Sequence, residues 1–204
     1  ADTGGADGSV VVNESQHDID FRIESNSSGN LFVADASTNR IGIGTTTPRT
    51  DLEVKSGTGA QLTLSTSDTS QTQNQLIGGI YFHNGDASGT GPNNAAVIEA
   101  QSAGSLGNAA NVVIKTSTAA VEQDDADETA RFTAAGDFLV STTDATLYNN
   151  TSGSGLCYRS NDELSIASES TTPLLILNYT GGSTTGTGDL IRFATDGATV
   201  GTFG

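Results

Sequence analysis

Hydrophobic and polar residues alternate in short runs along most of this chain. Phe21 and Ile23 fall on one side of an extended segment, and the same spacing recurs at Ile41 with Ile43, Leu52 with Val54 and Leu62 with Leu64. A period of two predicts β-strands that turn one face toward a core. Each run offers only a pair of large apolar side chains, and no long amphipathic helix pattern occurs. The alternation therefore predicts an all-β chain with little or no helix.

A sequence pattern typical of a strand, a turn and a second strand occurs twice. The first copy runs from Phe21 to Val33 through Gly29-Asn30, and the second runs from Arg131 to Val140 through Gly136-Asp137. Gly-Asn and Gly-Asp before an apolar triplet are typical of a tight hairpin in which one turn residue adopts a positive φ. Units this small bury little surface alone and become stable by stacking or by contact with a partner chain.

Glycine alternates with isoleucine between Asn39 and Pro48. Missing side chains at Gly42 and Gly44 would let another backbone approach closely, which in a multichain β shaft predicts a place near the axis. Pro48 lacks a donor N–H and should end the strand or bend the chain.

Shifts in composition divide the chain into four expected segments. Residues 1–20 are predicted to form an N-terminal extended arm, 21–75 a hairpin repeat module, 76–142 a larger β module that ends in the second hairpin copy, and 143–204 a C-terminal β module. The larger module contains a loop rich in Gly, Asn and Asp, and exposed loops of this kind often carry function. The residues of this loop that are candidates for contact with another surface are His83, Asn84, Asp86, Asn93 and Asn94.

The composition leaves little material for a thick core. Apolar residues make up 34% of the 204 residues and aromatic residues 5%, with no Trp and no Met. A compact monomer of this size normally holds a core of large side chains. The regular alternation argues for order with thin cores, and the expected solution is an elongated β structure in which identical chains share a narrow hydrophobic axis.

Charge limits the partners. Asp and Glu number 24 against 8 Lys and Arg, a formal net charge of −16. The resulting field repels phosphate backbones and anionic head groups, so no nucleic-acid partner is expected. No apolar run is long enough to cross a membrane as a helix, and no membrane insertion is expected.

The chemistry-bearing residues do not form a known catalytic pattern. Cys157 is alone, and His17 and His83 have no further His or Cys at metal-ligand spacing. The carboxylates are numerous enough to supply the pair that glycoside hydrolysis needs, but the chain has few aromatic rings to line a sugar groove. We therefore expect no enzyme activity, no cofactor and no metal site.

Four stretches resemble modules of bacteriophage tail fibres and related virion appendages, of the type found in phages of marine and freshwater bacteria. They are Asn39 to Pro48; Gly79 to Phe82 with Ala96 to Ala100; Thr129 to Val140; and Pro173 to Asn178 leading to Gly188 to Gly204. The resemblance implies an elongated, intertwined homotrimeric fibre of short β-hairpin and β-sandwich or prism-like modules. In that family the last phrase is often followed by a C-terminal chaperone domain that drives trimerisation and cuts itself off.

These observations predict a structural component of a bacteriophage virion, a homotrimeric tail fibre or fibre-like appendage that supports host attachment. Its expected partners are itself, other virion proteins and a host surface glycan or protein, and its expected location is the extracellular particle. The alternative is a glycan-binding adhesin module of a fibre tip or a bacterial cell surface; a capsid fibre or decoration protein and a polysaccharide depolymerase are further alternatives. The residues expected to be buried within or between chains are Ile41, Ile43, Leu52, Val54, Leu62, Leu64, Ile80, Phe82, Ile98, Ile114, Phe132, Phe138, Val140, Ile191 and Phe193.

Overall fold

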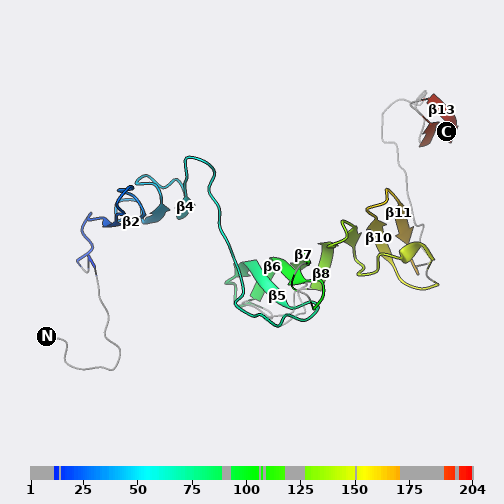
Figure 1. Ribbon diagram of the computed structural model, residues 1–204, viewed down its shortest axis with the longest axis horizontal. Helices are drawn as coiled ribbons and strands as arrows, with labels where there is room; N and C mark the ends of the chain where they lie inside the picture. Colours follow the sequence, from blue (N-terminus) through cyan, green and yellow to red (C-terminus); the bar gives the residue numbers. More distant parts are fainter. Residues whose placement is uncertain are drawn as a thin grey trace. The chain divides into compact units, whose positions relative to one another are not determined.

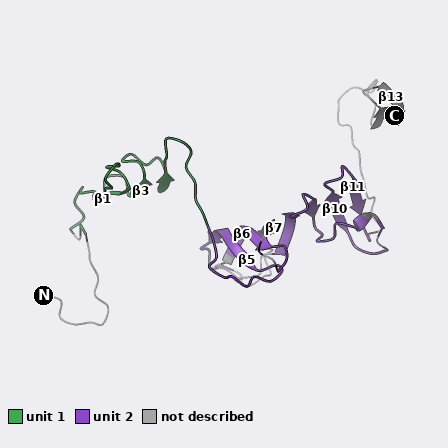
Figure 2. Ribbon diagram, in the orientation of Figure 1, with its two compact units in different colours: residues 1–63 green, residues 64–204 purple. Residues whose placement is uncertain are grey.

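The computed structural model of the chain describes residues 12–13, 15–88, 93–105, 107, 109–117, 127–149, 151–170, 191–195 and 198–203. These residues form sheets of four, seven and two strands (Figure 1). The one helical element among them is a short 3-10 turn, η1 (Leu147–Asn149). The prediction of an all-β chain with little helix is confirmed for this part of the chain. The chain divides into two compact units, residues 1–63 and 64–204 (Figure 2).

The first unit contains a four-stranded sheet, called here the small sheet. Its strands follow the chain order and are β1 (Phe21–Ile23), β2 (Phe32–Asp35), β3 (Arg40–Ile43) and β4 (Leu52–Val54). The first three pair antiparallel, whereas β3 and β4 pair parallel, with Ile41 opposite Leu52.

The first predicted hairpin is formed by β1 and β2, but its turn differs from the prediction. Neither Gly29 nor Asn30 has a positive φ. Serine side chains shape the loop instead: the Ser28 amide donates to Ser25 Oγ at 3.1 Å, and the Ser25 amide donates to the Ser28 carbonyl at 2.8 Å. The eight residues between the strands leave room for this wider loop, so a two-residue turn geometry is not needed.

Gly42 in β3 and Gly44 directly after it lie against the chain's own backbone. This corrects the expectation that a second chain approaches at these glycines. A Cβ on Gly42 would lie 2.4 Å from the Thr45 carbonyl oxygen, and a Cβ on Gly44 would lie 2.2 Å from the Lys55 carbonyl oxygen. Gly44 also has φ +75, a conformation that favours glycine. The segment after β3 therefore folds back under Gly42 before β4 begins, and Pro48 on it is buried.

The second unit contains the seven-stranded sheet, called here the large sheet. All neighbouring strands pair antiparallel, and their order in space is the order along the chain. The sheet continues past residue 142, where the sequence placed a module boundary. Its strands are β5 (Leu76–Asn84), β6 (Asn93–Ser102), β7 (Ala110–Thr116), β8 (Asp127–Phe132), β9 (Phe138–Val140), β10 (Gly155–Tyr158) and β11 (Leu164–Ala167).

The second predicted hairpin is formed by β8 and β9, and here the predicted turn is confirmed. Gly136 has φ +92, and its amide donates to the Thr133 carbonyl at 2.9 Å. The neighbouring Asp137 carboxylate accepts hydrogen bonds from the Ser160 amide at 2.9 Å and from Thr133 Oγ1 at 3.1 Å. The Ser160 amide is the main cause that lowers the pKa of Asp137 below its ordinary value. Asp137 thus ties this hairpin to the turn between β10 and β11.

The last sheet is the hairpin of β12 (Ile191–Thr195) and β13 (Ala198–Phe203), in which Thr195 pairs with Ala198. The Asp196-Gly197 turn lies outside the described residues, as do the side chains of Ile191 and Phe193.

Buried apolar side chains are few among the described residues, as the composition predicted. Val33 is the buried core residue of the small sheet. In the second unit, Leu139, Leu147 and Cys157 form a cluster, and Ala145 and Ala167 pack against it. The rest of the buried apolar set is Val97, Val113 and Ala130.

Candidate assembly surface

One face of the large sheet carries an unbroken column of aliphatic side chains, one from each strand. Residues directly opposite one another in an antiparallel pair point to the same face. The register therefore aligns one residue of every strand in a single row, which we call the aliphatic ladder: Ile80, Ile98, Ile114, Ala130, Val140, Leu156 and Ile166. No polar residue interrupts it from β5 to β11.

A second row runs beside the ladder on the same face from β7 to β11. This aromatic column consists of Val112, Phe132, Phe138, Tyr158 and Leu164, again directly opposite one another. The rings of Phe132 and Phe138 stack with centroids 4.8 Å apart and an angle of 27° between their planes. The ladder, the aromatic column and Phe82 together make up the apolar face of the large sheet.

The apolar face is covered only in part by the described part of the chain: Ala130 is buried, and Ile114, Phe138, Val140 and Leu156 are half-buried. Eight of its large side chains each keep 37% to 58% of their surface exposed: Ile80, Phe82, Ile98, Val112, Phe132, Tyr158, Leu164 and Ile166. Along β6 and β7, Ile98 and Val112 of this face are exposed, whereas Val97, Glu99 and Val113 of the other face are buried, so a carboxylate is buried beside an exposed isoleucine. This is the reverse of the usual arrangement for a half-buried sheet in water.

On the opposite face of the large sheet, charged side chains pair with one another and cover small apolar residues. Glu99 is 6% exposed and lies 2.6 Å from Lys115 Nζ, and Gln101 Nε2 donates to Glu99 Oε1 at 2.5 Å. Val113 is paired with both Glu99 and Arg131 in the register and is fully buried. Long side chains that lie over small apolar ones shield them from water.

A second ion pair continues this arrangement along β8. Arg131 Nε and Nη2 donate to the two carboxylate oxygens of Glu128, and both side chains are largely buried. The hydrogen bonds to Glu128 raise the pKa of Arg131. The charges of Glu99, Lys115, Glu128 and Arg131 on the opposite face are thus paired within the chain.

The small sheet has the same asymmetry. Phe21, Ala34, Ile41 and Leu52 are aligned across its four strands and lie on one face, with Ile23, Phe32, Ile43 and Val54 beside them. Among these, Phe21, Ile23, Ile41, Ile43 and Leu52 are exposed. Val33 points to the other face and is buried, where the segment after β3 lies under Gly42.

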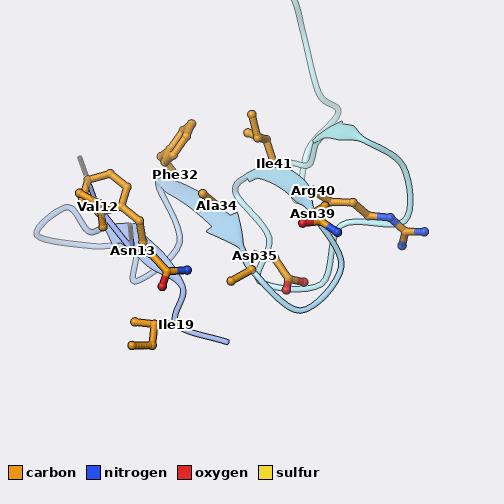
Figure 3. Close-up of a pocket in the computed structure, with 11 residues that line it drawn as sticks. Val12, Asn13, Ile19, Phe32, Ala34, Asp35, Asn39, Arg40 and Ile41 are labelled. Atoms are coloured by element: carbon orange, nitrogen blue, oxygen red, sulfur yellow. The ribbon is translucent and has the colours of Figure 1, made fainter. Parts of the chain in front are cut away.

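A pocket of about 450 Å³ opens on this apolar face of the small sheet. Figure 3 shows Phe32 of β2 and Ile41 of β3 on the same side of the sheet. Val12 and Ile19 of the preceding segment also line the pocket. The polar residues of the lining are Asn13 of the preceding segment, Asp35 at the end of β2, Asn39 in the turn and Arg40 at the start of β3. The pocket is thus a hollow in a larger apolar surface.

The structure brings most of the predicted core residues together on these two faces. Ile41, Ile43, Leu52 and Val54 lie on the small sheet; Ile80, Phe82, Ile98, Ile114, Phe132, Phe138 and Val140 lie on the large sheet. Leu62 and Leu64 lie outside the strands, although a Cβ on Gly78 would meet the Leu64 Cβ at 2.8 Å. A single chain leaves most of these side chains partly exposed, so their burial between chains stays a prediction.

The sequence missed several members of the apolar face. Val112, Leu156 and Tyr158 were not among the expected core residues, nor were Leu164 and Ile166. In Leu156-Cys157-Tyr158 and Leu164-Ser165-Ile166, the spacing of two places both large residues of each triplet on one face of a strand. The small residues between them give no indication of which face is covered.

The candidate host-contact residues lie together at one end of the β5–β6 hairpin. His83 pairs with Asn94 and Asn84 with Asn93. Asp86 accepts a hydrogen bond from the Ser88 amide at 2.9 Å, which lowers the pKa of Asp86. Residues 89–92 and the Asn93 side chain lie outside the described part of the structure. Host contact by this loop stays a prediction.

Within the described residues, no three or more His, Cys, Asp or Glu side chains are grouped so as to hold a metal ion. The same residues include no helix with the length and apolar character needed to cross a membrane. Comparison of the chain with protein families, with curated proteins and with solved structures finds no match.

Proposed function

We propose that this protein is a structural component of a bacteriophage virion, a homotrimeric tail fibre or fibre-like appendage that supports host attachment. The observation that carries the proposal is the incompletely covered apolar face of the large sheet, together with the similar face of the small sheet. A surface of this kind is completed by association, and every copy of the chain brings the same surface.

The energetics favour association of the apolar faces. Full burial of a large aliphatic or aromatic side chain contributes about 1.5–3 kcal/mol. Soluble monomers rarely expose a contiguous apolar patch larger than a few hundred Å², and larger patches mark interaction sites. The eight exposed side chains of the large sheet are about half exposed each, so their burial against other copies would stabilise the assembly substantially.

The strand order suits a spacer. Because each strand of the large sheet neighbours the next one along the chain, the chain advances by one strand spacing per element. At about 4.8 Å per strand, the seven strands carry it about 29 Å from β5 to β11. A protein built this way can hold the structures attached to its two ends apart, and this role needs no catalytic site.

The virion assignment is supported by the resemblance of four stretches of the sequence to modules of phage tail fibres. The net charge of −16 adds a physical argument, since it keeps the outer surfaces of neighbouring particles or fibres apart. The extracellular particle is the proposed location, and other virion proteins and a host surface glycan or protein are the proposed partners.

Light scattering coupled to size-exclusion chromatography, followed by sedimentation velocity, tests the proposal. We expect three copies of the 20.7 kDa chain in a particle with a large axial ratio. We also expect a thermal midpoint that rises with protein concentration, because association stabilises only the folded chain. A 20.7 kDa species at every concentration, with a midpoint that dilution does not change, would overturn the proposal.

A further inference from the structure

We infer that a second copy of this chain docks along the aliphatic ladder, in the same chain direction and with each strand level with its own equivalent. This inference rests on the proposed self-association and adds where the copies meet and how they are oriented. The ladder is the natural seam because it crosses all seven strands, whereas the aromatic column begins only at β7.

The exposed area suits another copy of the chain. Eight side chains, exposed by 37% to 58%, present together about 700 Å² if each has a full surface of roughly 200 Å². A stable interface of standard size takes about 800 Å² from each partner. The apolar face of the large sheet therefore nearly suffices alone.

Charge also selects this surface. The charged pairs Glu99–Lys115 and Glu128–Arg131 lie on the opposite face, and the ladder and the aromatic column contain no ionisable side chain except Tyr158. Two chains that each carry −16 repel one another over most of their surfaces. The apolar faces are the places where close approach buries apolar area without bringing carboxylates together.

The orientation follows from the proposed trimer. A closed homotrimer relates its copies by rotation about a single axis, so neighbouring copies run in the same direction along that axis. Rotation also keeps equivalent residues at the same level, which sets each strand of the ladder beside its own equivalent. We therefore assign the same direction to neighbouring copies.

Disulfide cross-linking at the two ends of the ladder tests this arrangement. Ile80→Cys on β5 and Ile166→Cys on β11 are prepared separately and mixed before assembly. The ladder ends are about 29 Å apart at about 4.8 Å per strand, and a disulfide needs Cα atoms within about 7 Å. We expect each variant to form a covalent dimer with itself under mild oxidation, and no dimer that joins residue 80 to residue 166.

Two controls accompany these variants. The native chain should give no dimer, because Cys157 lies on the opposite face and is fully buried. Tyr81→Cys places an exposed thiol on the opposite face of β5 and should also stay unlinked. An Ile→Cys change can instead dissociate the assembly while Tyr81→Cys leaves it intact. This selective loss of assembly would also show that the copies meet at the ladder.

Other outcomes overturn the inference. Dimers that join residue 80 to residue 166 would show opposite directions and would contradict the closed trimer as well. An intact trimer, by light scattering of the same samples, without any ladder cross-link would place the seam elsewhere and leave the fibre proposal standing. A native chain that remains a monomer would remove both.

Discussion

Phe132 and Tyr81 are exposed to nearly the same extent, 48% and 47%, but they lie on opposite faces of the large sheet. Tyr81 pairs with Val97, which belongs to the face with Lys115, whereas Phe132 pairs with Val112 and Phe138 on the apolar face. The two residues thus form a matched pair for separating self-association from ordinary surface exposure.

We expect Phe132→Thr to weaken assembly and Tyr81→Thr to leave it unchanged. Loss of a buried Phe costs about 1.5–3 kcal/mol per copy, and every 1.4 kcal/mol is a tenfold change in a dissociation constant. Sedimentation over a dilution series measures the change. Equal effects of the two substitutions would contradict a special role for the apolar face.

The ion pair between Glu99 and Lys115 gives a second expectation. Lys115→Met leaves the buried Glu99 carboxylate without its cation and should lower the free energy of unfolding by about 2–3 kcal/mol. Arg22→Met, which breaks an exposed pair with Glu24, should change it by less than about 0.5 kcal/mol. Urea unfolding at one fixed protein concentration measures both. The double variant Lys115→Met with Glu99→Gln should recover part of the loss.

The Asp137 carboxylate should make stability depend on acid pH. Its folded pKa lies below the ordinary value of 3.8, so its hydrogen bonds stabilise the fold at pH values above about 3.8. That contribution is lost as the pH falls from there through the folded pKa. Asp137→Asn should therefore destabilise the chain by about 1–3 kcal/mol at neutral pH, and the difference from the native chain should shrink in acid.

Urea midpoints measured between about pH 7 and about pH 2 check this expectation. Asp18→Asn, which changes an exposed carboxylate, is the control for the general effect of one lost charge. A difference between Asp137→Asn and the native chain that stays constant over the whole range would contradict the assignment.

Gly42 and Gly57 form a matched pair in the first unit. A Cβ at Gly42 would lie 2.4 Å from the Thr45 carbonyl oxygen, whereas a Cβ at Gly57 would meet nothing within 4 Å. We expect Gly42→Ala to cost about 1–3 kcal/mol through backbone displacement. Gly57→Ala should be neutral or stabilise by up to about 1 kcal/mol. Hydrogen exchange of β3 and β4 reports the local change, and an unaffected β3 in Gly42→Ala would contradict the close approach.

Alternation along the chain was sufficient to predict most of the strands and part of the membership of the apolar faces. Residues such as Ile98 and Ile114 could be assigned to one side because a period of two fixes the face of every residue within a strand. The turn at Gly136 was predictable as well, because a five-residue loop after β8 needs one residue with a positive φ.

What covers each face could not be predicted from alternation. The close approach at Gly42 depends on a parallel pairing of β3 with β4, and the sequence carries no signal for that choice of partner. The opposite face depends on Glu99, Lys115 and Arg131, which read as ordinary outward-facing polar residues in each strand taken alone. Glu99 is buried, and Lys115 and Arg131 are partly buried, because the three residues come from neighbouring strands and lie close together on one face.

The agreement between the order of strands in the large sheet and their order along the chain bears on how the protein is made. Every strand from β6 onward finds its first partner in the segment synthesised just before it. Such pairing keeps the sequence separation of native contacts low, and low contact order favours rapid folding. The sheet can therefore grow one strand at a time during translation, with no need to await a distant part of the polypeptide.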